Sequence, residues 1–314
     1  MIIHNREKPI FMEKMEILLG RLPSTHPSVR AIESELYKVR AGFHGEKEVD
    51  YHLRELDRPG IFILHDLRLK TTTGSFFQID TLILTESEAI ILEIKNYAGP
   101  LTYDTQTRQL IRPPDVMPNP FFQVRRQQNH LQNFLLSEQL SHFPTKAFVV
   151  FANPQARLSI EPPDDKISHL LLYPSELSSK ISNSSKRLSG TELTRLVTPF
   201  KKLNRPLDLN VLSHFHVDPA AIMHGIRCPQ CGMLEVSREY SSWRCRGCLS
   251  KTKYAHFQAL YDYSLLFGNQ LTVKQTMNFL QMTSRFTAQR LLSQVSIRDK
   301  RVYHLDLNLL RLRK

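Results

Sequence analysis

The sequence predicts an α/β protein with a small metal-binding module, and three observations support that prediction. Helical and β-rich segments alternate from the N-terminus to residue 203, which is typical of an α/β core. The chain has four cysteines, and they form two C-x-x-C pairs. Lysine and arginine outnumber aspartate and glutamate by 42 to 30, a net charge of +12 that favours a polyanionic partner such as nucleic acid.

The spacing of apolar residues predicts the elements of the core in order. Helical patterns cover residues 11–19 and 29–36, and a further helix is expected from about Gly45 to Leu56. The remaining elements are β-rich runs at 61–69, 75–84 and 89–95, a proline-rich loop at 113–120, a helix at 121–136, a strand at 147–151, a polar stretch at 153–166, an apolar run at 170–173, a helix with an exposed end at 178–190 and an amphipathic helix at 191–203. This order predicts an α/β core of roughly 170 residues.

The cysteine pairs have the spacing of a zinc ribbon, in which four thiolates hold one tetrahedral Zn²⁺. The pairs are Cys228/Cys231 and Cys245/Cys248, and the segment between them alternates well enough to form a hairpin around Trp243. So few apolar residues lie here that metal binding must supply much of the folding free energy. Four thiolate ligands leave no coordination position for catalysis, so we expect a structural zinc.

The alternative for the cysteines is two disulfides in a secreted domain. The chain starts with the polar residues Met-Ile-Ile-His-Asn-Arg-Glu-Lys and shows no signal peptide, which favours zinc and a cytoplasmic location. No apolar stretch reaches the ~18 residues that a membrane span requires, so no membrane association is expected.

Three acidic residues and a lysine mark a candidate site in the core. Glu46 is expected to open the helix before the strands, and Asp80 lies in the second strand. Glu93 and Lys95 are two apart in the third strand, so their side chains share one face of it. Burying both charges is costly unless they pair with each other or Asp80 and Glu93 hold a divalent metal.

Four segments, in this order, resemble the nuclease-related domain family called NERD. They are Gly45-Glu46-Lys47-Glu48, Gln78-Ile79-Asp80, Glu93-Ile94-Lys95-Asn96-Tyr97 and Asn119-Pro120-Phe121-Phe122-Gln123. The resemblance covers about residues 38–175. It implies a restriction-endonuclease-like core of the PD-(D/E)xK superfamily, with a mixed central sheet flanked by helices.

The same resemblance implies a role for each residue. Asp80 and Glu93 would bind Mg²⁺ or Mn²⁺, and Lys95 would orient the attacking water or stabilise charge on phosphorus. Glu46 would complete the site, and Gln123 would add an accessory polar contact. Phosphodiester hydrolysis needs such a metal and such a cation, and hard oxygen ligands select Mg²⁺ or Mn²⁺ over zinc.

Each of these residues also has a structural alternative. Glu46 could be a favourable charge in a helix's first turn, Asp80 a turn cap, and Glu93 with Lys95 an ion pair without catalytic function. The role of Gln123 could fall to polar residues within two helical turns of it, Arg125, Arg126, Gln127 and Gln128.

The C-terminal segment resembles a winged helix-turn-helix domain. Its pattern predicts a helix at 271–280 with Thr272 as N-cap, a second helix at 285–294 capped by Ser284, and a hairpin at 297–305 with a basic tip. In such domains the second helix enters the major groove and the wing contacts the backbone. The residues expected to bind nucleic acid are Arg285, Gln289, Arg290, Arg298, Lys300 and Arg301. The alternative is a small helical domain that packs on the ribbon or on another protein.

These predictions divide the chain into an N-terminal helical extension (1–37), a NERD-like nuclease domain (38–206), a linker with the zinc ribbon (207–254) and a winged-helix-like module (255–314). The expected function is metal-dependent phosphodiester cleavage, with DNA favoured over RNA. Two rivals remain: a DNA-binding protein that retains the nuclease fold without cleavage, and an adaptor that binds a DNA-processing protein.

Overall fold

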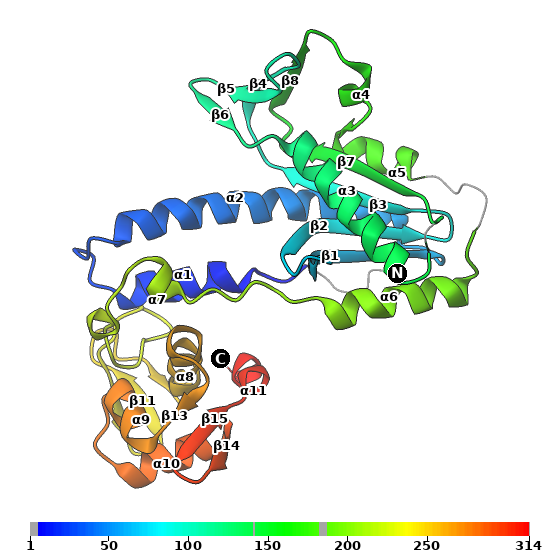
Figure 1. The fold of residues 1–314 in the computed structure, drawn as a ribbon. Coiled ribbons are helices and arrows are strands. Elements are labelled where there is room, and N and C mark those ends of the chain that lie inside the picture. Colours follow the sequence, from blue (N-terminus) through cyan, green and yellow to red (C-terminus); the bar gives the residue numbers. More distant parts are fainter. Residues whose placement is uncertain (1–5, 141, 182–186, 314) are drawn as a thin grey trace. The chain divides into compact units, whose positions relative to one another are not determined.

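The computed structural model describes residues 6–140, 142–181 and 187–313, and the chain divides into two compact units (Figure 1). Unit 1 comprises Met1–Pro9 and Lys38–Leu207, and unit 2 comprises Ile10–Tyr37 and Asp208–Lys314. The division into four parts that the sequence suggested stays a prediction.

A mixed five-stranded sheet forms the centre of unit 1, with strand order β1-β2-β3-β7-β9. β1, β2 and β3 pair antiparallel, whereas β7 pairs parallel with both β3 and β9. The strands are β1 (Ile61–Lys70), β2 (Phe76–Thr85), β3 (Ala89–Lys95), β7 (Thr145–Phe151) and β9 (Leu171–Leu172). The predicted β-rich runs therefore form one sheet.

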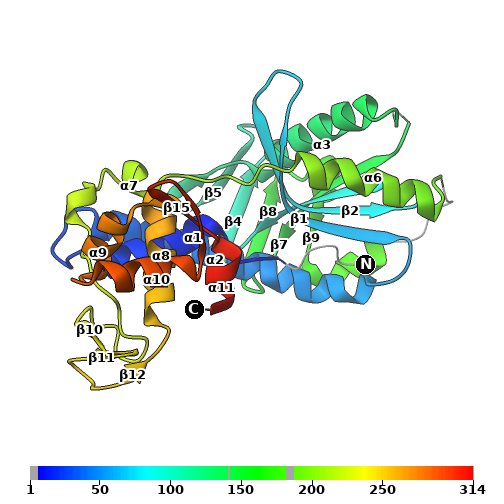
Figure 2. The same cartoon turned by 90° about the horizontal axis from the view of Figure 1, so that it is seen from below.

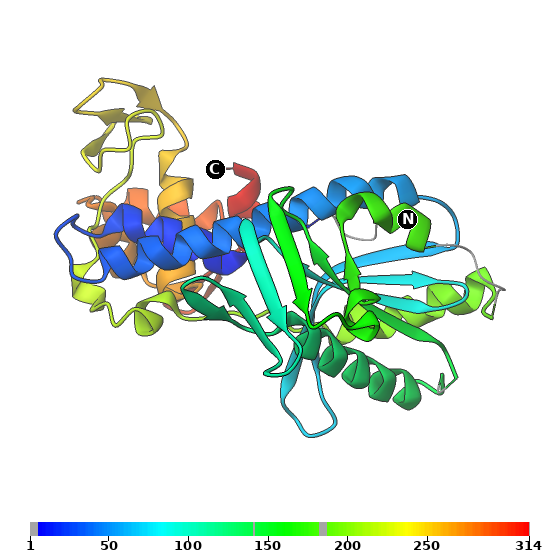
Figure 3. The same ribbon diagram turned by 90° about the horizontal axis from the view of Figure 1, so that it is seen from above.

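Helices cover both faces of this sheet, because each face is apolar. On one face α3 (Pro120–Ser137) and α6 (Gly190–Leu203) pack over a cluster that includes Ile91. On the other face α2 (Val29–Leu53) and α5 (Leu177–Lys180) pack over Ile90 and its neighbours. Figure 2 and Figure 3 show α2 and α3 on opposite sides of the sheet. The alternation of β3 thus places Glu93 on the α3 side.

Helix α2 is continuous, where the sequence predicted two helices. Gly45 does not interrupt it; a Cβ at this position would lie 2.5 Å from the Cβ of Asn96, so the glycine permits close approach of the segment after β3. The Asn96 amide in turn donates to the Ala41 carbonyl at 2.6 Å. The expectation that Glu46 opens a helix is wrong, and with it the alternative that Glu46 is a first-turn charge.

A second sheet in unit 1 was not predicted. It has four strands in the order β6-β5-β4-β8, namely β4 (Gly99–Asp104), β5 (Gln109–Arg112), β6 (Asp115–Met117) and β8 (Ala156–Glu161). β6 lies in the expected proline-rich loop and β8 in the expected polar stretch. After the buried Ala156, β8 alternates between exposed and partly buried residues, and its partner β4 is distant in sequence, so local composition did not reveal the pairing.

The predicted helix with an exposed end at 178–190 is realised only in part. α5 covers its start, and α6 begins after the N-cap Ser189, whose hydroxyl accepts from the Glu192 amide. Residues 182–186 of this prediction lie outside the described residues. A short helix, α4 (Asp165–Ser168), precedes β9.

Unit 2 confirms the predicted caps of its C-terminal helices. Thr272 accepts from the Gln275 amide and Ser284 from the Thr287 amide. The helices are α1 (Ile10–Arg21), α7 (Val211–His214), α8 (Ala255–Phe267), α9 (Val273–Leu280), α10 (Arg285–Ser293) and α11 (Leu307–Arg313). The strands form two three-stranded sheets, one of β10 (Val236–Glu239), β11 (Ser242–Cys245) and β12 (Lys251–Thr252), the other of β13 (Gln270–Leu271), β15 (Val302–Leu305) and β14 (Ser296–Asp299).

Helix α8 was not predicted from the sequence. Almost all of its residues are buried, so it has no polar stripe to reveal a helical period. It is tied to α1 by a buried ion pair in which Arg21 Nη2 lies 2.8 Å from Asp262 Oδ2. Of the helices in the described ranges, none combines the length and the apolar composition needed to cross a membrane.

Candidate nuclease site and four-cysteine site

Asp80 lies where β2 separates from β3. The pairing of these strands runs from Leu84↔Ala89 to Thr81↔Leu92 and then stops. Past the last pair, the Ile94 N–H donates to Asp80 Oδ2 at 2.9 Å. The Asp80 side chain thus accepts the hydrogen bond that a backbone carbonyl of β2 would otherwise accept. The carboxylate is thereby held at the edge of the ladder.

Glu93 and Lys95 meet two glutamines of α3. The Lys95 ammonium donates to Glu93 Oε1 at 2.6 Å and to Gln123 Oε1 at 3.2 Å. Gln127, one turn further along the helix, donates from Nε2 to Glu93 Oε2 at 2.6 Å. Asn119 caps α3 by accepting from the first amides of the helix, which sets the register of both glutamines. Gln127 therefore joins Gln123 in the site and does not replace it.

Glu46 belongs to a neighbouring group of carboxylates. Asp50 follows it by one turn of α2, and Asp66 comes from β1. The guanidinium of Arg6 binds all three, at 3.0 Å from Glu46, 2.9 Å from Asp50 and 2.9 Å from Asp66. The sequence had pointed to Glu46 alone among these four residues.

Burial controls the electrostatics of the site. It raises the pKa of Glu93 to about 7, and the nearby charge of Asp80 adds to this effect. Burial also raises the pKa of Asp80, although the Ile94 N–H and Lys95 oppose the change. Burial lowers the pKa of Lys95, but the charges of Glu93, Asp80 and Tyr97 together raise it above its usual value. The two carboxylates thus repel each other despite the shared cation.

The second carboxylate group has the same character. Burial raises the pKa of Glu46 to about 8 and that of Asp66 to about 6, in both cases against the stabilising charge of Arg6. Asp80 raises both values further, which links the two groups electrostatically. Partly buried carboxylates with strongly raised pKa values are typical of functional sites, although ion-pair networks also produce them.

Asp66 was missed by the sequence reasoning, although β1 carries a signal for it. His65 and Asp66 interrupt an otherwise mostly apolar strand. Asp66 falls between the pairs His65↔Thr81 and Leu67↔Ile79, and so lies across from Asp80. Its φ of 52° is left-handed, a conformation that aspartate tolerates better than most residues but that is unusual within a strand.

The residues present fit a hard divalent cation. Asp80 and Glu93 offer carboxylate oxygens from adjacent strands, which is the ligand type that Mg²⁺ and Mn²⁺ prefer. Burial and the nearby charge of Asp80 both raise the pKa of Glu93, so the site disfavours two negative charges, and a divalent cation would stabilise them. Asp80 and Glu93 are thus the residues that would hold the metal.

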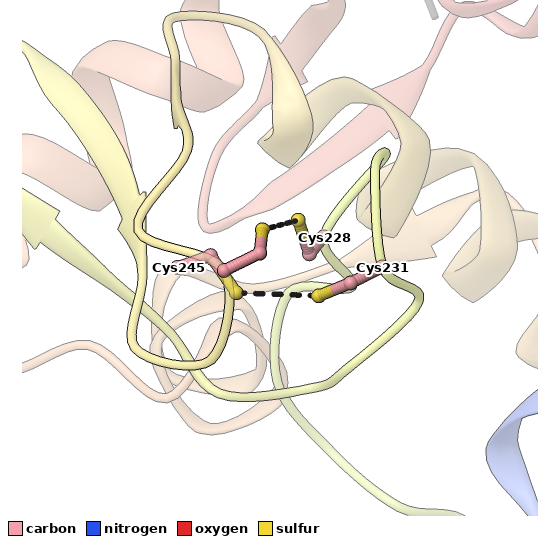
Figure 4. Close-up of side chains that lie close together, drawn as sticks. Cys228, Cys231 and Cys245 are labelled. Atoms are coloured by element: carbon pink, nitrogen blue, oxygen red, sulfur yellow. Dashed lines mark hydrogen bonds between the residues drawn. The ribbon is translucent and has the colours of Figure 1, made fainter.

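The four cysteines come together at one end of unit 2, and Figure 4 shows Cys231 beside Cys245. Their sulfurs all lie within 4.8 Å of one another, with 3.5 Å between Cys231 and Cys245 and 3.6 Å between Cys228 and Cys248. Tetrahedral zinc with Zn–S bonds of about 2.3 Å places its sulfurs about 3.8 Å apart. These distances exclude disulfides and fit one zinc ion.

Ser250 supports the cysteine group and was not predicted. Its hydroxyl lies 3.3 Å from Cys228 Sγ and 3.1 Å from Cys248 Sγ, so it can donate to one of the two sulfurs when they are thiolates that bind a metal. Trp243 on β11 is 1% exposed, as expected for the centre of the small core. The predicted hairpin between the cysteine pairs is formed by β10 and β11.

The predicted nucleic-acid residues lie on α10 and on the β14–β15 hairpin, and most of them are exposed. A groove of about 710 Å³ is lined by four of the six, Arg285, Gln289, Arg298 and Arg301. Lys274 of α9 also lines it, and no acidic side chain does. Arg290 and Lys300 lie outside this groove. The groove is therefore a basic surface.

Comparison with known proteins identifies the domain that carries the site. Residues 41–152 match the sequence profile of the NERD family, described as the nuclease-related domain. The chain therefore contains a nuclease-related domain, as the four sequence segments had predicted. The matched range includes Glu46, Asp66, Asp80, Glu93, Lys95, Gln123 and Gln127 but not Arg6.

Individual relatives add little on activity. An uncharacterized protein of Bacillus anthracis, pXO1-01, is 28% identical over 137 residues, which is 42% of this chain and 62% of that protein. This chain thus spans less than two thirds of that relative. The crystal structure of protein VC1899 from Vibrio cholerae matches 64% of this chain and 59% of its own, with 12% identity and a TM-score of 0.23, too low to infer a shared fold.

Proposed function

We propose that this protein is a metal-dependent nuclease that hydrolyses phosphodiester bonds, with DNA as the favoured substrate. The observation that carries the proposal is the convergence of Asp80, Glu93 and Lys95 at the point where β2 leaves β3. A protein that only binds DNA has no need of two mutually repelling carboxylates beside a partly buried lysine. The nuclease-related domain supports the same class of reaction.

The residues of the site divide the chemistry among them. A Mg²⁺ or Mn²⁺ ion held by Asp80 and Glu93 would polarise the phosphoryl oxygen and lower the pKa of a bound water. Lys95 holds a positive charge where negative charge develops on phosphorus. Gln123 and Gln127 fix the positions of Lys95 and Glu93 through hydrogen bonds of 3.2 and 2.6 Å.

The basic groove of unit 2 supports a second part of the proposal, that this unit binds the nucleic acid. Four arginine or lysine side chains, from α9, α10 and the hairpin, line the groove without an opposing carboxylate. Phosphate neutralisation by such side chains supplies most of non-specific DNA affinity. The order of these elements supports a winged-helix mode of binding, with α10 in the major groove.

The experiment is cleavage of labelled linear and circular DNA by the full-length, zinc-loaded protein. Reactions contain Mg²⁺, Mn²⁺ or buffer depleted of divalent ions, because EDTA could also strip the zinc. We expect cutting only with added cation. Asp80→Ala and Glu93→Ala should lower the rate on the order of 10²-fold or more.

Two controls keep the result interpretable. Asp115→Ala changes an exposed carboxylate in β6 of the same unit and should cut like the wild type. Single-stranded DNA and RNA substrates test the preference for DNA. A folded protein that binds DNA but cuts none of these substrates would overturn the nuclease proposal in favour of a binding function.

A further inference from the structure

Arg6 reaches the candidate site from outside the matched nuclease-related domain. Its side chain is 1% exposed, although the segment that carries it has no regular secondary structure. Nη1 contacts both Glu46 and Asp66, at 3.0 and 2.9 Å. Nε donates to Asp50 Oδ2 at 2.9 Å, and Nη2 donates to Asp50 Oδ1 at 3.3 Å.

The same guanidinium also binds the strand that carries Asp80. Nη2 donates to the Asp80 carbonyl at 3.2 Å and to Thr81 Oγ1 at 2.8 Å, and it lies 3.1 Å from His65 Nδ1. One planar group therefore connects α2, β1 and β2. Lysine, with a single nitrogen, cannot make this set of contacts.

These contacts set the position of Glu46. Glu46 comes from α2, on the face of the sheet opposite to α3, and burial strongly disfavours its charge. Glu46 forms an ion pair with Arg6, whose Nη1 also contacts Asp66. Without the guanidinium, three partly buried carboxylates would face one another with no cation between them.

We propose that Arg6 is a positioning residue of the nuclease site and acts through Glu46. By joining Glu46 to Asp66 and to the backbone of Asp80, it holds the helix carboxylate beside the strand carboxylates that would bind the metal. The inference rests on the proposed function. It extends the functional unit beyond residues 41–152 to the N-terminal segment.

The test is a double-mutant cycle on Mn²⁺ binding, followed by the EPR signal of the free ion in the full-length, zinc-loaded protein. Arg6→Ala should weaken Mn²⁺ binding on the order of tenfold, as expected when a side chain that positions the residues around a metal is lost. In a Glu46→Gln background the same change should cost less than about twofold, because its effect passes through Glu46. Arg157→Ala, an exposed arginine of β8, is the matched control and should leave the affinity unchanged.

Arg6→Lys separates charge from geometry and guards against a misfolded alanine variant. It should recover part of the affinity that Arg6→Ala loses. Equal losses from Arg6→Ala in both backgrounds, or no loss in either, would overturn the proposal. A wild type that binds Mn²⁺ but cuts nothing overturns only the nuclease activity, whereas one that binds no Mn²⁺ overturns both proposals.

Discussion

The two polar sites of this protein differ in how far their residues are separated in sequence. The four cysteines lie between residues 228 and 248, on one hairpin and its flanking knuckles. The carboxylate site draws on the N-terminal segment, α2, three strands and α3. A site whose residues are close in sequence can be recognised from their spacing. A site whose residues are far apart in sequence can be recognised only from the fold that brings them together.

The sites also differ in what holds them together. The cysteine module has a very small core around Trp243, so zinc binding has to stabilise it. The carboxylate site is embedded in a sheet with apolar clusters on both faces, which fold without it. Loss of metal should therefore unfold the first site and only relax the second.

The largest effect is expected at the cysteines. Structural zinc contributes about 10–16 kcal/mol of apparent binding free energy in small zinc modules, so Cys245→Ser should abolish stoichiometric zinc and unfold β10–β12. Mass spectrometry gives the zinc content, and hydrogen exchange follows the hairpin amides. Ser250→Ala is the milder control and should retain the zinc. Loss of hydrogen-exchange protection in β3 as well would contradict the expectation that only the cysteine module depends on zinc for its fold.

A smaller effect is expected when a divalent cation binds the carboxylate site. A ligand at 100 times its Kd stabilises the folded state by about 2.7 kcal/mol, so Mg²⁺ or Mn²⁺ should raise the Tm of the zinc-loaded protein. Asp80→Asn should remove this rise while leaving the fold intact. Differential scanning calorimetry measures both. An equal rise in the variant would place the cation elsewhere.

The pH dependence of stability should be dominated by carboxylates whose pKa is raised. Burial raises the pKa of Glu46 from 4.5 to about 8, so between these values the folded state keeps a proton that the unfolded chain has released. The contribution of Glu46 to the free energy of unfolding is therefore at its maximum below pH 4.5 and is lost as the pH rises through about 8. Glu46→Gln should gain stability relative to the wild type as the pH rises over this range. Thermal unfolding from pH 5 to 9 without divalent cation tests this, with Glu48→Gln, an exposed neighbour on α2, as control.

The smallest effect concerns the basic groove of unit 2. Arg285→Ala should weaken DNA binding by about the same factor for every sequence and reduce the slope of log K against log salt by about 1. Fluorescence anisotropy at several salt concentrations measures the slope. Cleavage of short substrates at saturating concentration should change little. An unchanged slope would favour a groove that binds protein.

The sequence predicted the strands of the central sheet and the caps of α9 and α10, because local periodicity and capping residues determine them. It misplaced Glu46 because Gly45 was interpreted as a helix boundary, whereas the glycine serves close packing against Asn96. Strand placement marked Asp80, Glu93 and Lys95 as a candidate site, and the family resemblance assigned their roles and added Gln123. Arg6 gave no local signal, since an arginine in an irregular segment has no pattern that points to its partner.

The backbone of Asp66 has a consequence for how this protein can vary among relatives. A residue with φ of 52° inside a strand excludes β-branched side chains, even though strands otherwise favour them. Natural sequences that keep this strand geometry should therefore favour aspartate, asparagine and glycine at this position. Of these three, only aspartate supplies a charge. The frequency of asparagine or glycine here would thus distinguish a lineage that needs the carboxylate from one that needs only the turn of the backbone.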